Sequence, residues 1–113
     1  PESLQNNNAG RAYFGLGLEV YKRVCKDAEK FDLTGLALMT ANKIDEIIKA
    51  HIYPDGSLMV DWTAKDRLIG TMKLEIEDYL IDEIKRKYGI PLTFDDMDSI
   101  IDSSVDVASK WFR

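Results

Sequence analysis

Four stretches of the sequence place apolar residues three or four positions apart, as an amphipathic helix does. Polar or turn-forming segments separate these stretches, whose apolar residues begin near Tyr13, Leu33, Leu68 and Met97. Apart from a few extended residues around 58–60, no stretch has the pattern of a strand. The pattern therefore predicts an all-α fold, a small bundle of about four amphipathic helices with its own hydrophobic core.

Signals for helix starts and stops support this division. Asp32 is placed to cap the second helix, and Gly89 is placed to end the third. A capping-box spacing, with Asp in place of the usual Glu, occurs twice, at 63–66 and at 93–96. We therefore expect Thr63 and Thr93 to cap the third and fourth helices. Within the first helix, Gly15 and Gly17 weaken the helix or allow another backbone to come close.

The length of 113 residues suits one domain. Residues 1–8 are polar, with three successive asparagines, and are expected to form a flexible lead-in; residues 9–113 form the single helical domain. Because the chain begins with Pro1 rather than Met, we expect it to be a fragment of a larger multidomain protein.

Net charge and cysteine content narrow the function classes. The net charge is −5, and residues 92–109 hold five aspartates and no basic residue, so the rest of the chain sums to zero. Such a chain is not a general polyanion binder, and any nucleic-acid contact has to come from a local cluster. The single cysteine, Cys25, excludes an internal disulfide and is expected to be a buried helical residue. No apolar run reaches the roughly 18 residues of a membrane span, so a cytoplasmic location is expected, with no membrane partner.

Residues that could carry catalysis or bind a metal are sparse. His51 is the only histidine, and we expect it to lie in the last turn of the second helix, where a cation suits the helix dipole. Two sets of carboxylates share a helix face, Glu75/Asp78/Asp82 and Asp95/Asp98/Asp102. Each set lies opposite an apolar stripe, so a solvated face is favoured over a metal or acid–base site. We therefore predict no catalytic, cofactor-binding or metal-binding residue in this chain.

Basic residues on the third helix are the candidates for contact with DNA or a protein partner: Lys65, Arg67, Lys73, Lys85, Arg86 and Lys87. The last three have a structural explanation, because cations in a last helical turn suit the dipole. Positioned Lys and Arg side chains also meet phosphates, so both interpretations stay open.

The segment MVDWTAKDR, residues 59–67, resembles a catalytic loop at first sight. The helical pattern favours a structural interpretation, in which Met59 and Trp62 fill the core beneath a turn. Asp61 is then expected to accept a hydrogen bond from the backbone or from Arg67. Only Lys65 and Arg67 remain free for a partner.

Residues 61–108 resemble the extreme C-terminal domain of the motor and endonuclease subunit of type I restriction–modification enzymes. The resemblance rests on the pair Asp61-Trp62, on Arg67, on the Arg86-Lys87-Tyr88-Gly89 run, and on a closing helix rich in Ile and Val over 100–108. It is most specific over residues 59–109, and residues 8–24 are compatible with the helix that precedes this region in the family.

The resemblance implies a helical, non-catalytic domain that docks the motor subunit onto the methyltransferase and specificity subunits. It also implies contact with the remaining domains of the motor subunit. ATP and Mg²⁺ would be used elsewhere in the parent, whose helicase motifs and nuclease carboxylates are absent from this chain. The acidic last helix departs from the family pattern, which favours protein docking over DNA binding by that helix. The alternative is a helical protein–protein interaction module of an unrelated cytoplasmic system, which the net acidity favours.

Overall fold

The computed structural model describes residues 8–113, so the predicted lead-in lies outside the described range except for Asn8, which begins the first helix. The main helices are α1 (Asn8–Val24), α2 (Leu33–Ile52), α3 (Asp66–Tyr79) and α4 (Phe94–Trp111). Helix α3 continues into a π-helical segment, η4 (Leu80–Lys87), and the short 3-10 turns η2 (Ala28–Lys30) and η3 (Trp62–Ala64) lie in the connections. No strand occurs over residues 8–113, and the predicted all-α bundle is confirmed.

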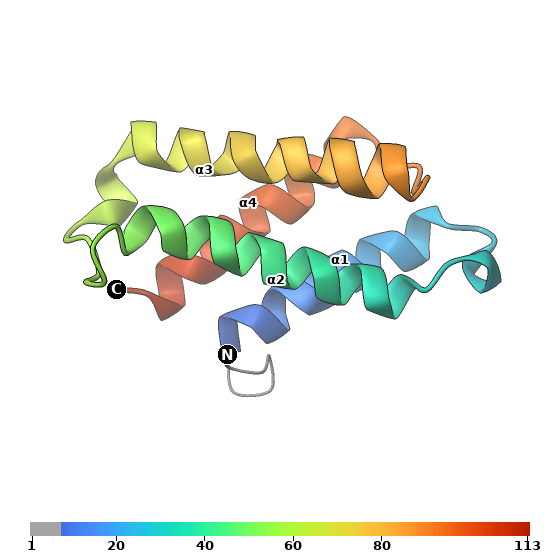
Figure 1. The fold of residues 1–113 in the computed structure, drawn as a ribbon, viewed down its shortest axis with the longest axis horizontal. Helices are drawn as coiled ribbons and strands as arrows, with labels where there is room; N and C mark the ends of the chain where they lie inside the picture. Colours follow the sequence, from blue (N-terminus) through green and yellow to red (C-terminus); the bar gives the residue numbers. More distant parts are fainter. Residues whose placement is uncertain (1–7) are drawn as a thin grey trace.

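The helices pack around one core. Helix α1 makes its most extensive contacts with α2 and its next most extensive with α4, whereas α3 packs on α2 and α4. In Figure 1, α2 crosses the middle of the molecule, α3 runs along one side, and α4 passes behind them. The C-terminal end of α4 lies beside the connection between α2 and α3 (Figure 1). This arrangement brings two segments about 50 positions apart in the sequence into contact, as the Trp62–Phe112 hydrogen bond shows.

Every helix contributes fully buried side chains to the core. The largest are Trp62, Tyr13, Tyr21, Ile44, Ile48, Ile52, Met72, Ile76, Leu80, Ile84, Ile90 and Leu92. Burying one aliphatic side chain of this size contributes about 1.5–3 kcal/mol. Ile44, Ile48 and Ile52 stand four residues apart, so one stripe of α2 faces the core along most of its length.

At Gly17, helix α1 approaches α2 more closely than it does at Gly15. A Cβ atom at Gly17 would lie 3.9 Å from the Ala37 Cα, whereas one at Gly15 would meet nothing within 4 Å. The expectation that a glycine admits a neighbouring backbone therefore holds at Gly17, which is buried, and not at Gly15, which is exposed.

The first helix ends earlier than its apolar pattern indicates. It stops at Val24, while Ala28 lies in η2 and Phe31 follows as its C-cap. Cys25 comes directly after the helix; it is buried as predicted, but it is not helical. Burial raises the pKa of its thiol.

Two of the three predicted N-caps are confirmed. The Asp32 carboxylate accepts a hydrogen bond from the Gly35 N–H at 2.9 Å, and Thr93 forms a complete capping box at the start of α4. The cap predicted at Thr63 is wrong, because Thr63 lies inside η3 and Lys65 precedes α3 with no side-chain cap. Gly89, with φ of +77°, ends the long helix in the left-handed region that favours glycine.

Candidate functional site

The six basic candidates do not form one surface. Lys65 and Arg67 lie at the start of α3, and Lys85, Arg86 and Lys87 lie at the end of η4. The 14 residues of α3 alone span about 21 Å at a rise of about 1.5 Å per residue, and η4 lengthens the helix beyond that. Figure 1 shows these two ends at opposite sides of the molecule. The structure therefore separates the candidates into two clusters, with Lys73 between them.

The cluster at the end of η4 is exposed and engaged in local pairs. The Arg86 guanidinium lies 3.6 Å from the Asp82 carboxylate, and the Lys87 ammonium lies 3.6 Å from Glu83, each one helical turn back. The Lys85 ammonium lies 5.8 Å from the centre of the Phe94 ring. Exposed pairs of this kind contribute only about 0–1 kcal/mol, so these cations can exchange partners at little cost.

The other basic residues differ in their surroundings. Lys65 and Arg67 are exposed, and neither forms an ion pair within the described part of the chain. The Lys73 ammonium lies 3.1 Å from the Asp102 carboxylate, so this exposed pair bridges α3 and α4. Asp102 remains exposed, as expected for its helix face.

The turn at residues 59–62 is anchored by Trp62. Its side chain is only 2% exposed, and its indole N–H donates a hydrogen bond to the Phe112 carbonyl at 2.6 Å. Met59 is half-buried against the core, as predicted. Asp61 adopts a left-handed conformation with φ of 55°, and its carboxylate forms no hydrogen bond with Arg67 or any other residue of the described chain. The expected role of Asp61 as an acceptor is therefore wrong, because its carboxylate is exposed.

A cleft of about 710 Å³ lies beside this turn. It is lined by Leu58, Met59, Val60, Asp61, Trp62, Thr63, Ser109 and Arg113. Val60, which lines the cleft, is 79% exposed. Trp111, the last residue of α4, is 56% exposed.

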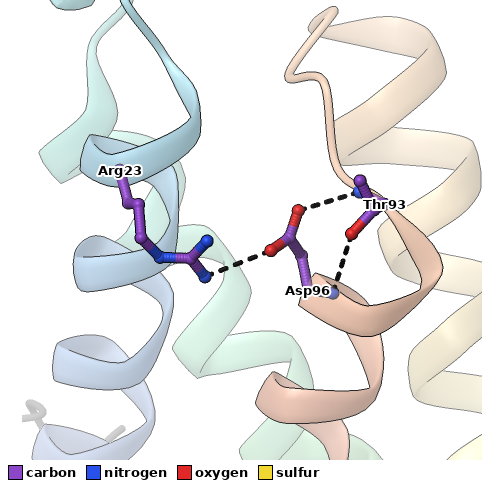
Figure 2. A network of polar contacts seen from close by, with 3 residues as sticks. All are labelled: Arg23, Thr93 and Asp96. Carbon is purple, nitrogen blue, oxygen red and sulfur yellow. Dashed lines mark hydrogen bonds and ion pairs between the residues drawn. The ribbon is translucent and has the colours of Figure 1, made fainter.

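Arg23, Thr93 and Asp96 form a polar clasp between α1 and α4 (Figure 2). The Asp96 carboxylate accepts hydrogen bonds from the Thr93 backbone N–H at 2.9 Å and from the Arg23 guanidinium at 3.1 Å, while the Asp96 N–H donates to the Thr93 hydroxyl. These bonds, the Thr93 N–H foremost, hold the pKa of Asp96 below its usual value of 3.8. The clasp is structural, because the capping box and the ion pair account for all three side chains.

His51 lies in the last turn of α2, as predicted, and joins α2 to α3. Its Nδ1 lies 2.9 Å from the Ile47 carbonyl, and its Nε2 lies 3.3 Å from the Glu75 carboxylate. A shallow groove of about 400 Å³ runs alongside, with Lys43, Glu46, Glu75, Asp78, Asp82 and Glu83 among its lining residues. Within residues 8–113, no three His, Cys, Asp or Glu side chains come together in a group that could hold a metal ion.

Two hydroxyl groups in the core, those of Tyr21 and Thr40, form a polar pair. The Tyr21 and Thr40 hydroxyls lie 2.8 Å apart, and Thr40 in turn donates to the Leu36 carbonyl. Burial raises the pKa of both Tyr13 and Tyr21 well above the usual value. These tyrosines stay neutral at physiological pH and have no access to solvent, so they are parts of the core.

Sequence reasoning missed one hollow, of about 650 Å³, between the start of α2 and the end of η4. We refer to it as the Tyr88 hollow; it is lined by Lys30, Phe31, Asp32, Gly35, Leu36, Met39, Lys87 and Tyr88. A signal was present in the sequence, because Lys30-Phe31 and Lys87-Tyr88 both place a lysine beside an aromatic residue. Their distance in the chain concealed that the two pairs meet.

Comparisons with known proteins give no assignment. No protein-family model, no curated protein and no solved structure matches the chain. Among the described helices, none is long and apolar enough to cross a membrane. Function is therefore argued from the sequence resemblance and from the surfaces described above.

Proposed function

We propose that this chain is a non-catalytic assembly domain of a type I restriction endonuclease motor subunit. It would dock that subunit onto the methyltransferase and specificity subunits, and its exposed basic residues would contact DNA. The observation that carries this proposal is the sequence pattern Asp61-Trp62, Arg67 and Arg86-Lys87-Tyr88-Gly89. ATP and Mg²⁺ would act in other domains of the parent.

The surface beside Trp62 supports a docking role. Val60 and Trp111 expose apolar side chains at the end of the bundle where the Asp61-Trp62 pair lies, and the cleft there is open. Apolar and aromatic anchors of this kind supply most of the binding energy at protein interfaces. Lys65 and Arg67, at the nearby start of α3, have no ion-pair partner within residues 8–113 and are available to an acidic partner.

The test is assembly of the parent subunit with and without residues 8–113. We expect the shortened subunit to lose co-elution with the methyltransferase core in size-exclusion chromatography. A double variant, Val60→Asp with Trp111→Asp, should weaken assembly while the helical circular dichroism is retained. The matched control is Leu74→Asp, which places a charge at an exposed apolar position in the middle of α3. Normal assembly by the shortened subunit would contradict the proposal.

The alternative is an interaction module of an unrelated cytoplasmic system. The acidic groove beside Glu75 and Asp78 favours it, because several carboxylates there face solvent and would suit a basic protein partner. The sequence upstream of this chain in its gene separates the two functions. Helicase motifs there are expected under the restriction-subunit proposal, and their absence would favour the alternative.

A further inference from the structure

The Tyr88 hollow combines apolar and basic lining residues. Leu36 is buried, Phe31 and Tyr88 are half-buried, and Met39 is 41% exposed. Its volume of about 650 Å³ falls within the roughly 300–1,000 Å³ typical of small-ligand sites. Two aromatic rings contributed from different elements therefore border a space large enough for a flat organic group.

The charges around the hollow favour an anion. Lys30 and Lys87 line it, and Asp32 is the one carboxylate among its lining residues. The Asp32 carboxylate already accepts the Gly35 N–H at the start of α2, where the helix dipole is positive.

Neither lysine is held firmly by its present partner. The Lys30 ammonium lies 3.4 Å from Asp27, and the Lys87 ammonium lies 3.6 Å from Glu83, with all four side chains between 40% and 75% exposed. The Lys87 ammonium also lies 5.5 Å from the centre of the Tyr88 ring, so cation and ring are presented together. Exposed pairs contribute little to stability, and an incoming phosphate can replace either carboxylate.

We propose that the Tyr88 hollow binds single-stranded DNA, with one base stacked against Tyr88 and the neighbouring phosphates on Lys30 and Lys87. Rings that stack with bases beside cations that follow the backbone are the two components of sites for single strands. A duplex does not fit this chemistry, because its base faces are already stacked on one another. The inference rests on the DNA-contact part of the proposed function and is independent of subunit docking.

Fluorescence anisotropy with a labelled oligothymidylate of about fifteen nucleotides tests this site on the 113-residue chain. We expect the single strand to bind at least tenfold more tightly than a duplex of equal length. Tyr88→Leu, which keeps an apolar side chain but removes the ring, should weaken binding about tenfold. Tyr88→Phe keeps the stacking face and should bind as the unmodified chain does.

The salt dependence tests the phosphate contacts separately. The double variant Lys30→Ala with Lys87→Ala should reduce the slope of log affinity against log salt by about 1.4, at about 0.7 per phosphate contact on a single strand. The matched control, Lys43→Ala with Lys110→Ala, removes two lysines that form exposed i,i+3 and i,i+4 pairs away from the hollow and should leave that slope unchanged. Circular dichroism melting shows that each variant is folded.

Several results would overturn the site. These are equal affinity for single strand and duplex, unchanged binding by Tyr88→Leu, or the same loss of slope in both lysine and control variants. Displacement of the oligonucleotide by an acidic peptide of equal charge would assign the hollow to a protein partner instead. Failure of the assembly test with intact oligonucleotide binding would remove the docking proposal and leave this site standing.

Discussion

Two helix starts in this molecule share one sequence spacing and have different structures. Thr63 and Asp66 stand at the start of α3, and Thr93 and Asp96 stand at the start of α4, each pair with the spacing Thr-x-x-Asp. At α4 the threonine has extended backbone angles, φ of −87° and ψ of 168°, and the full capping box forms. At α3 the threonine lies within a 3-10 turn, and no side chain caps the helix.

The difference arises from what precedes each threonine. Trp62 is buried and held by the Phe112 carbonyl, which fixes η3 around Thr63 and denies it the extended conformation that a capping residue needs. Leu92 is buried in the irregular segment before α4, Thr93 has the extended angles of a capping residue, and Arg23 further secures Asp96. A cap therefore depends on tertiary anchors as well as on spacing.

Removing Trp62, which anchors the start of α3, should have the largest effect on the free energy of unfolding. Trp62→Ala loses a buried indole and leaves the Phe112 carbonyl without its donor, so we expect the free energy of unfolding to fall by about 3–5 kcal/mol. Urea unfolding followed by far-UV circular dichroism measures this change. Trp111→Ala removes an exposed ring and should stay within about 0.5 kcal/mol. Similar losses in both variants would contradict the anchoring role of Trp62.

Removing the two threonines tests the comparison directly. Thr93→Ala deletes a capping hydroxyl and should lower the free energy of unfolding by about 1 kcal/mol. Thr63→Ala deletes no cap and should change it by less than about 0.5 kcal/mol. The urea midpoints of both variants measure these changes. An equal loss of stability in Thr63→Ala and Thr93→Ala would show that a capping box at residues 63–66 forms in solution.

The pH dependence of stability sharpens the comparison further. The folded-state pKa of Asp96 is lowered, so the folded protein binds fewer protons there than the unfolded chain does. The stability that Asp96 contributes is present above the unfolded pKa of about 3.9 and is lost as pH falls through the folded pKa. We expect urea unfolding between about pH 5 and pH 3 to show a steeper loss in the unmodified chain than in Asp96→Asn. Asp66→Asn, at the uncapped start, should retain the steep loss.

The smallest effect is expected at Asp61. Its carboxylate makes no hydrogen bond with other described residues, and glycine adopts the left-handed conformation without strain. Asp61→Gly should therefore change the free energy of unfolding by less than about 0.5 kcal/mol, since relief of strain offsets the greater freedom of the unfolded chain. Thermal unfolding checks this, and a loss above about 1 kcal/mol would reveal a contact that the carboxylate makes in solution.

Much of the fold followed from local patterns in the sequence. The apolar stripes, the Asp32 cap and the Gly89 stop act within a few residues of one another, so local spacing predicts them. The Thr-x-x-Asp spacing predicted two caps, of which only the one at Thr93 forms. The missing cap at Thr63 depends on packing between distant segments, because the adjacent Trp62 is bonded to Phe112. The apolar spacing also gave no signal that α1 ends at Val24. The π-helical form of η4 also had no signal in the apolar spacing.

The candidate site was less predictable than the fold. The six basic residues were correctly placed on or near one long helix, but its length puts Lys65 and Lys87 at opposite ends of the bundle. The Tyr88 hollow joins Phe31 to Tyr88 across 57 positions of the chain, and no local pattern predicts which aromatic residues will meet. Whether these surfaces bind DNA or a protein stays a prediction.

Trp62 also gives the domain an intrinsic optical reporter. The chain has two tryptophans, one buried and one largely exposed, so their emission should differ in wavelength and in access to a quencher. With Trp111→Phe, the remaining signal comes from the indole bonded to the Phe112 carbonyl. Its emission then reports whether the C-terminal end of α4 is closed against the 59–62 turn, and a partner that engages this end would be detected without any added label.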